Sequence, residues 1–379
     1  MRASLKIFFK RLETLNKRFL FRFVLRYIFR NQFIPNPIQL AEINHVLILR
    51  NDVIGDMVIT TAFINFLLDF NPKLKISVVT SSHAEPVLRY DKRLSQIFIL
   101  ERTLSSLIKL IMNARGEYSV TFALSLNGVS RDAILANLLA PNSIKVTYDI
   151  GWPEDREYYR FLFNQQITVG HEEWPLWKKL ISLGESVFGV SYPENQIRQS
   201  LYYPIEIEKE MNQFLKQYNI EPKSFLLFNL SARLDYKKWG ETNNSEFINI
   251  FLSQYPKVPV IISSAPEDRS EALRIKENSG SKNIINTPES FGLFHVMALA
   301  QSARVVFSPD TAVIHFAATF NTPSYIICTA LASHPVWQPC STEFRTHYAH
   351  EFDPVSELKP QEVFNGFQLF LTEKKIYTS

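Results

Sequence analysis

The sequence predicts an α/β fold with two parallel, doubly wound sheets, and three observations lead to this prediction. The chain has 379 residues, more than a single hydrophobic core usually organises, so two domains are expected. Hydrophobic residues make up 46% of it and charged residues 21%, a balance typical of globular proteins. Short apolar runs alternate with helical patterns along most of the chain, as strands and helices do in parallel sheets.

The elements fall into two series. In the first, a strand is expected at 45–49, followed by a polar loop at 50–56 and a helix at 57–70. Further strands are expected at 75–80, 96–100 and 119–124, with a helix at 104–113. The second series has its strands at 225–230, 258–263, 305–308 and 324–328. Residues 151–200, rich in Trp, Tyr and Glu, join the two series, and no internal repeat is found.

The first 34 residues differ from the rest of the chain in charge. They contain nine Lys or Arg and one acid, a net +8, whereas the whole chain has a net charge of +4 and residues 35–379 therefore carry −4. Apolar residues at spacings of three and four predict one or two amphipathic helices there. Such a segment suits the interface of an anionic cytoplasmic leaflet, or packs its aromatic face on its own protein or on a twin subunit. Pro35 and Pro37 end it.

These patterns give three segments. We expect a helical extension at 1–37, an N-terminal domain at 38–203 and a C-terminal domain at 204–379. The basic residues belong to the extension rather than to the body, so a nucleic-acid-binding surface is not expected.

Several functional classes lack their sequence signatures. The Gly-x-Gly-x-x-Gly fingerprint, the phosphate loop of P-loop enzymes and the Gly-x-Ser-x-Gly elbow do not occur. No Asp-x-Asp pair or His/Cys cluster has metal-ligand spacing, so neither a metal nor a cofactor is expected. Two cysteines give no disulfide framework, and no stretch is long and apolar enough for a membrane span or an export signal. A cytoplasmic protein is the expectation.

Polar residues gather where the predicted strands end. Because parallel sheets bind ligands outside the carboxyl ends of their strands, these residues are the candidates for a site. They lie at 50–56 in the first series and at 231–239, 263–268 and 308–315 in the second.

Several of these segments resemble glycosyltransferase family 9, the heptosyltransferase-like enzymes of lipopolysaccharide assembly. Residues 47–56, Leu-Ile-Leu-Arg-Asn-Asp-Val-Ile-Gly-Asp, look like the family's strand followed by Arg-x-Asp-x-Ile-Gly-Asp. Lys237-Lys238-Trp239 is similar to the family's Lys-x-Trp loop, and residues 308–318 to its Asp-Thr-Gly-x-x-His-x-Ala-Ala signature. His171-Glu172 is similar to a His-Glu segment that precedes a Leu-rich helix. The matches run in order from about residue 45 to about 330.

The resemblance implies a GT-B architecture with two facing Rossmann-like domains. It implies an inverting, metal-independent glycosyltransferase that moves a sugar, heptose by default, from a nucleotide sugar such as ADP-heptose. The acceptor would be a lipopolysaccharide-type or other lipid-linked saccharide at the inner face of the cytoplasmic membrane. The alternative is a catalytically idle relative that binds a nucleotide, a glycan or a partner protein.

Inverting transfer needs a base for the acceptor hydroxyl and a means of stabilising the departing diphosphate. Asp56 stands where the family has its base, after Gly55, which would let the backbone turn; otherwise Asp56 caps the following helix. Arg50 and Asp52 are expected to support it, as an ion pair that shapes the loop.

The second series supplies the candidates for donor binding. Lys237 matches the family lysine, with Lys238 as a solvated neighbour or a substitute for it; otherwise the two lysines simply form an exposed turn. Thr311 would bind phosphate at a helix N-terminus or simply cap that helix. Asp310 is expected to organise the loop. His315 would reach the site or be a hydrogen-bonded core histidine. Glu267 resembles the family acid on the nucleoside ribose, or begins a helix.

Three departures from the family pattern concern the donor. Ala312 replaces the glycine after Asp-Thr, and its methyl group would crowd a phosphate near the backbone. Ala62 and Gly240 stand where the family has prolines. These changes put ADP-heptose in question as the donor without affecting the predicted fold.

Overall fold

The computed structural model describes residues 25–126, 129–149, 160–170, 173–330, 335–351 and 353–377. The chain divides into two compact units, residues 1–197 and 198–379, so the division falls slightly before the expected boundary at Tyr203-Pro204. Each unit contains one six-stranded sheet in which the neighbouring strands run parallel. The predicted α/β class is therefore confirmed.

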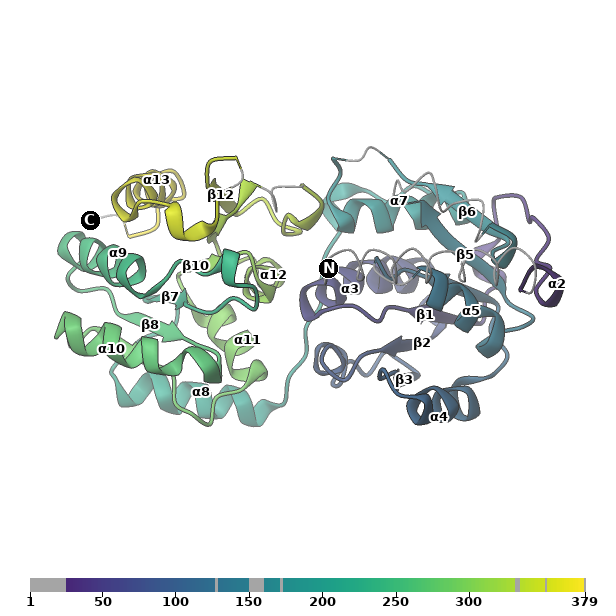
Figure 1. Cartoon of the computed structure of the whole chain (residues 1–379), viewed down its shortest axis with the longest axis horizontal. Helices are drawn as coiled ribbons and strands as arrows, with labels where there is room; N and C mark the ends of the chain where they lie inside the picture. The colour runs from purple at the N-terminus through teal and green to yellow at the C-terminus, as the bar shows by residue number, and fades with distance from the viewer. Residues whose placement is uncertain are drawn as a thin grey trace, which may run out of the picture. The chain divides into compact units, whose positions relative to one another are not determined.

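The N-terminal unit holds the first sheet, whose strand order is β3-β2-β1-β4-β5-β6 (Figure 1). Its strands are β1 (His45–Leu49), β2 (Lys75–Thr80), β3 (Gln96–Ile99), β4 (Val120–Ala123), β5 (Ile144–Asp149) and β6 (Gln165–Thr168). Its longer helices are α3 (Ile54–Phe70), α4 (Leu104–Ala114), α5 (Val129–Leu139) and α7 (Leu176–Phe188).

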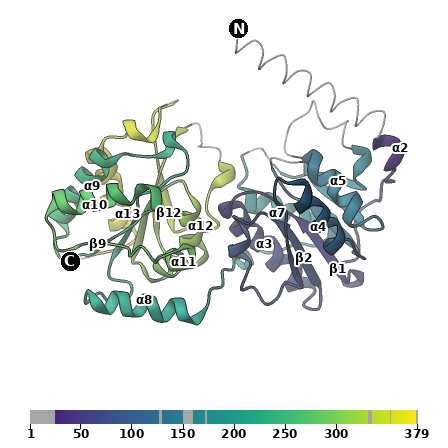
Figure 2. The ribbon, with the colours of Figure 1, turned by 60° about the horizontal axis from the view of Figure 1, so that its bottom comes forward.

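Helices cover both faces of this sheet (Figure 2). Leu47 and Leu49 of β1 share a buried cluster with α4 and α5. On the opposite face Phe122 of β4 contacts Phe63 of α3 and Phe188 of α7. Side chains alternate between the faces of a strand, so the unbroken apolar run of β1 serves both cores.

The C-terminal unit repeats the same strand order, written β12-β11-β10-β7-β8-β9 along its sheet. Its strands are β7 (Leu226–Asn229), β8 (Val260–Ser263), β9 (Ile284–Asn286), β10 (Val305–Pro309), β11 (Ser324–Cys328) and β12 (Phe344–Tyr348). Its helices are α8 (Ile205–Gln217), α9 (Glu241–Gln254), α10 (Arg269–Ser279), α11 (Leu293–Ser302), α12 (Ala312–Thr319) and α13 (Pro360–Glu373). Helices α9, α10 and α13 contribute to one large aromatic cluster, and α11 packs against α8 and α12.

Four strands were not expected from the sequence: β5, β6, β9 and β12. They are short or mix polar with apolar residues, and three of them, the edge strands β6, β9 and β12, pair on one side only. Lys145 shows the difficulty, since it lies inside β5 with 1% exposure. Its Nζ donates to the carbonyl oxygens of Pro141 and Ser143, contacts that the apolar pattern does not reveal.

The described part of the N-terminal extension is helical only at α2 (Arg26–Ile28). Beyond it the chain lies against β6 rather than continuing the expected helix to residue 34: the Ile34 amide donates to the Asn164 carbonyl, and Gln165 donates to the Ile34 carbonyl. Leu25 is buried with Leu162, whereas Tyr27 is 70% exposed. Residues 1–24, which carry most of the predicted amphipathic pattern, lie outside the described residues.

Candidate functional site

Each sheet has a topological switch point, where the chain's connections reverse direction and where such sheets bind ligands. In the N-terminal unit it lies between β1 and β4, and in the C-terminal unit between β7 and β10. The segments that follow β1, β7 and β10 contain the predicted site residues except Glu267, which follows β8.

Arg50 follows β1 and is fully buried. Its guanidinium lies 3.3 Å from Asp52 Oδ2 and 3.7 Å from Asp56 Oδ1, and it donates a short hydrogen bond to the Leu124 carbonyl at the end of β4. Burial alone would lower the pKa of Arg50, but the carboxylates of Asp56 and Asp52 outweigh it and raise the pKa. The guanidinium is thus a permanent charge that holds two acids at the switch point.

Asp56 does not cap α3, contrary to the alternative role considered from the sequence. The N-cap residue is Val53, with extended backbone and no side-chain cap hydrogen bond, and Asp56 is the third residue of the helix. Gly55 is the second residue of α3 and is absent from the positive-φ residues, so the turn before the helix does not depend on it. Asp56 is 6% exposed and is held from the side by Arg50.

Two further buried groups adjoin this cluster that the sequence did not suggest. Tyr148 of β5 donates to the same Leu124 carbonyl at 3.1 Å. Asp132 of α5 pairs with Arg131 at 3.1 Å. Burial raises the pKa of Asp132 to about 6, the charge of Asp52 adds to this, and Arg131 opposes it. The sequence offered only one signal for these two groups, a polar residue within a helical pattern, and it was not recognised as part of a site.

In the C-terminal unit Lys237 and Asp310 meet. Lys237 ends a short helical turn after β7, and its Nζ lies 2.5 Å from Asp310 Oδ2. Lys238 points elsewhere: its side chain is 32% exposed and pairs with Asp268 at 2.7 Å. Trp239 is 1% exposed and donates to the Leu358 carbonyl, which anchors the loop that carries both lysines.

Thr311 is the N-cap of α12, and its Oγ1 accepts from the Val313 amide. Asn229, at the end of β7, donates to Thr311 Oγ1 at 3.2 Å and to Ser308 Oγ at 2.9 Å. The capping role is therefore present, and the first amides of α12 remain oriented as an anion site. Ala312 is the first residue of that helix.

His315 is buried, but the hydrogen-bonded core histidine expected as an alternative is not fully realised. In the described part of the chain its Nδ1 has no hydrogen-bond partner. Burial lowers the pKa of His315 to about 4, so the imidazole is neutral at pH 7. Glu267 lies exposed in a short helical turn after β8, and within the described residues no hydrogen bond or ion pair joins it to Lys237, Asp310, Thr311 or His315.

Two departures from the family pattern have local explanations. Gly240, which precedes α9, has a φ of 90°. Proline cannot adopt this angle because its ring fixes φ near −65°. Ala62 lies inside α3 at 1% exposure, where a good helix former is favoured. His171-Glu172 lies outside the described residues.

Two general findings accompany these sites. Among the described residues no group of three or more His, Cys, Asp or Glu side chains is placed to hold a metal ion. Within the same residues no helix has the length and apolar character needed to cross a membrane.

Comparisons with known proteins agree with one another. The model of glycosyltransferase family 9 (heptosyltransferase) matches residues 111–346. A protein of Escherichia coli (strain K12) named "Putative lipopolysaccharide heptosyltransferase 4" is 20% identical over 328 residues, or 83% of this chain and 84% of that protein.

Solved structures show the same fold. A family 9 glycosyltransferase from Veillonella parvula DSM 2008 has a TM-score of 0.73 at 14% identity, covering 89% of this chain and 99% of that one. The E. coli heptosyltransferase WaaC with ADP has a TM-score of 0.69 at 16% identity, covering 86% and 99%. These likenesses support the predicted GT-B type of fold with two Rossmann-like units.

Proposed function

Because the chain belongs to glycosyltransferase family 9 and is a heptosyltransferase-like glycosyltransferase, we propose that it moves a heptose from ADP-heptose to a lipid-linked saccharide of the lipopolysaccharide type. The reaction would invert the anomeric carbon and need no metal. The observation that supports this most is the cluster of Lys237, the N-terminus of α12 and the unpartnered His315 Nδ1, which offers a cation, amide donors and a neutral imidazole to a diphosphate.

The leaving group sets the requirements on the C-terminal unit. As the sugar departs, negative charge grows on the diphosphate. Lys237 would shift from Asp310 toward the phosphate, and the free amides at the start of α12 would bind its oxygens. The resemblance adds Glu267 as a ribose contact, and its exposure leaves it accessible.

The attacking hydroxyl sets the requirement on the N-terminal unit. Asp56 would accept its proton while the sugar is transferred. Arg50 keeps Asp56 in one position through the 3.7 Å contact between them. Asp52, the other carboxylate beside the guanidinium, is itself fixed because it accepts a hydrogen bond from the Leu126 amide at 3.0 Å.

Donor identity is tested by binding. Purified protein is titrated with ADP, UDP, GDP and their sugars, with Lys237→Ala and its neighbour Lys238→Ala as matched variants. A ligand that binds only the folded state raises the melting temperature by mass action. We expect ADP-heptose to stabilise the wild type and Lys238→Ala but to lose most of its effect on Lys237→Ala, because a charge-assisted contact contributes about 1.5–3 kcal/mol. A preference for another nucleotide would replace the donor, and no response to any would contradict the proposal.

We also propose that the protein acts at the inner face of the cytoplasmic membrane. The described end of the extension supports this, since the apolar Tyr27, Ile28 and Phe33 are 70%, 62% and 77% exposed beside the exposed Arg26 and Arg30. Flotation with anionic vesicles should recover the full chain. Equal recovery of a chain lacking residues 1–34 would contradict the role of the extension.

A further inference from the structure

Helix α4 has more apolar surface than its own sheet covers. Leu110 and Ala114 are buried in the core on one face of the first sheet. A second row of apolar side chains is exposed instead: Leu104 by 72%, Ile108 by 49% and Met112 by 77%. These three residues are four positions apart and form one stripe along the helix. The apolar residues of α4 extend over about 200° around its axis, against about 100° for a helix that packs on one surface, so the outer part of that arc stays exposed.

The described end of the N-terminal extension lies on the same face of the first sheet as α4. Leu25 is buried with Ala123 of β4 and Ala133 of α5. Ala123 stands beside Leu49 of β1 in the parallel register, and Leu49 packs in one cluster with α4 and α5. Residues in register point to the same face of a sheet, so α2, α5 and α4 cover one face, with α5 between the other two (Figure 2).

The charges on this face are mainly positive. The segment 101–117 has five charged residues, all exposed: Arg102, Lys109, Arg115, Glu101 and Glu117. Residues 25–34 add two arginines and no acid, so the two segments together have five cations and two acids, a net +3. Residues 35–379 as a whole carry a net −4. The stripe on α4 is therefore surrounded by positive charge on a domain body that is otherwise acidic, and this arrangement attracts an anionic surface.

A lipid surface fits this stripe better than a second protein chain does. A stable protein interface buries about 800 Å² on each partner, which takes about 20–30 residues, whereas the stripe has three large side chains on one helix of 11 residues. A helix with an apolar stripe and flanking Lys or Arg is suited to the boundary between headgroups and acyl chains. There its apolar side chains enter the lipid and its cations meet phosphates.

The stripe begins close to the proposed acceptor site. Asn51, the neighbour of Arg50, donates to the Leu100 carbonyl at 3.3 Å, and Leu104 follows Leu100 by one turn. The exposed end of α4 therefore starts at the edge of the sheet where β1 and β3 end, the same edge from which the chain enters the loop before Asp56. A membrane lying against this face would hold a lipid-linked saccharide near that edge.

We propose that Leu104, Ile108 and Met112 of α4 form a second membrane contact, which inserts into an anionic phospholipid surface together with the N-terminal extension. This contact presupposes the proposed action at the membrane and assigns a part of the folded N-terminal unit to it. The extension alone would tether the protein in many orientations. Two contacts on one face fix one orientation, in which the N-terminal unit faces its acceptor.

Vesicle binding of the full chain tests the contact. The partition coefficient is measured for the wild type and for the double variant Leu104→Gln/Met112→Gln, with vesicles of phosphatidylcholine alone or mixed with phosphatidylglycerol. The matched control is Leu273→Gln/Leu369→Gln, on leucines of α10 and α13 that are 48% and 61% exposed. Glutamine is a good helix former, so all these variants should keep the wild-type melting temperature.

The expected effects differ between the variants. Wild type and the control should bind the anionic vesicles equally, whereas Leu104→Gln/Met112→Gln should bind about tenfold more weakly, because two apolar side chains no longer enter the lipid. Lys109→Gln should bind the anionic vesicles about fivefold more weakly and the neutral ones unchanged, since it removes one cation near the phosphates.

Met112 gives a local readout in the unaltered chain. It is 77% exposed, whereas Met57, Met211 and Met297 are at most 1% exposed. Peroxide oxidises an accessible methionine to its sulfoxide, and mass spectrometry follows each methionine separately. Anionic vesicles should slow the oxidation of Met112 several-fold. A slowing that instead grows with protein concentration in the absence of vesicles would assign the stripe to a second copy of the chain and overturn the lipid contact.

The remaining outcomes separate this contact from the proposals it builds on. If Leu104→Gln/Met112→Gln binds anionic vesicles as tightly as wild type, or if Met112 is oxidised equally fast in the bound protein, the second contact is wrong and the role of the extension stands. If wild type does not bind anionic vesicles, the proposed action at the membrane fails and the second contact fails with it. The nucleotide-sugar titration decides the proposed transfer reaction independently of both.

Discussion

The clusters after β1 and β7 occupy the same position in two sheets of identical strand order. One encloses its cation between two carboxylates, whereas the other leaves its cation partly exposed. In the N-terminal unit Arg50 is buried between Asp52 and Asp56, and the protein supplies both of its counter-charges. In the C-terminal unit Lys237 is 19% exposed and faces Asp310, the N-terminus of α12 and an imidazole whose Nδ1 has no partner in the described chain.

The comparison shows that the same fold can hold a charged side chain in a buried ion cluster or leave it available to a ligand. A fully enclosed ion cluster stabilises one geometry, which suits a base that must meet a hydroxyl in one orientation. Lys237 is partly exposed, and its counter-ion is the single carboxylate of Asp310. It can therefore exchange that carboxylate for a diphosphate. Four predictions test the contrast, from the largest expected effect to the smallest.

Asp56→Asn should remove catalysis without removing donor binding. A general base contributes about 10²- to 10⁴-fold to a rate, so kcat should fall by that order while the Kd for the donor is unchanged. Asp69→Asn, at the far end of the same helix, is the control and should keep its activity. A retained kcat in Asp56→Asn would assign the base to another residue.

Arg50→Met should destabilise the protein strongly. It leaves two buried carboxylates without their cation, and breaking a buried pair from one side costs about 3–5 kcal/mol. The control is Arg89→Met, which removes an ion pair whose arginine is 48% exposed and should cost about 0–1 kcal/mol. Urea unfolding measures both. Comparable losses of unfolding free energy in the two variants would mean that the buried ion cluster around Arg50 stabilises the protein no more than an exposed ion pair does.

The two units should respond oppositely to pH. Asp132 has a folded pKa of about 6 against 3.8, so its contribution is present below pH 3.8 and lost as pH rises through 6. His315 has a folded pKa of about 4 against 6.5, so its contribution is present above pH 6.5 and lost as pH falls through 4. Each shift corresponds to about 3 kcal/mol.

Variants of Asp132 and His315 separate their two contributions to the pH dependence of the unfolding free energy. Relative to wild type, Asp132→Asn should gain unfolding free energy as pH rises from 4 to 7, whereas His315→Gln should gain it as pH falls over the same range. Hydrogen exchange assigns each change to its unit. Differences that stay constant with pH would show that neither group titrates in this window.

The sequence predicted the strand-end loops well because their chemistry is local. Strand β1, its polar loop and α3 follow one another within 26 residues, and the apolar pattern of each is unmixed. The pairing of Lys237 with Asp310 spans 73 residues, and only the strand order brings them together. The roles of Asp56 and Lys237 in the reaction remain predictions.

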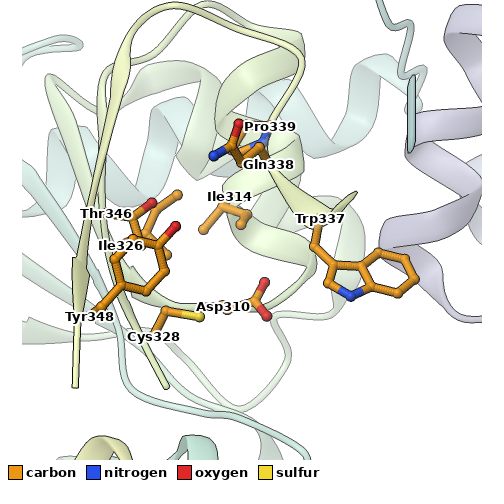
Figure 3. A pocket seen from close by; sticks show the side chains of 9 residues that line it. All are labelled: Asp310, Ile314, Ile326, Cys328, Trp337, Gln338, Pro339, Thr346 and Tyr348. Atoms are coloured by element: carbon orange, nitrogen blue, oxygen red, sulfur yellow. The ribbon is translucent and has the colours of Figure 1, made fainter. Parts of the chain in front are cut away.

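The position of strand β12 was beyond reach of the sequence for the same reason. Its residues, Phe-Arg-Thr-His-Tyr, show no apolar alternation. Its register against β11 decides that Thr346 and Tyr348 lie on one face of the sheet (Figure 3), whereas His347 lies on the other and bonds Tyr325. A slip of one residue would reverse these faces.

Ala312→Gly tests how close the donor comes to α12 and should have the smallest effect. If the methyl group crowds a phosphate, its removal should tighten donor binding by about 1 kcal/mol, roughly fivefold, whereas glycine at this helix start should cost about 0.5–1 kcal/mol of stability. The two changes have opposite signs and are measured separately, by calorimetry and by urea unfolding. Weaker donor binding in Ala312→Gly would show that the alanine methyl group contacts the donor favourably. Ala312 would then contribute to donor specificity at the N-terminus of α12 rather than obstruct binding there.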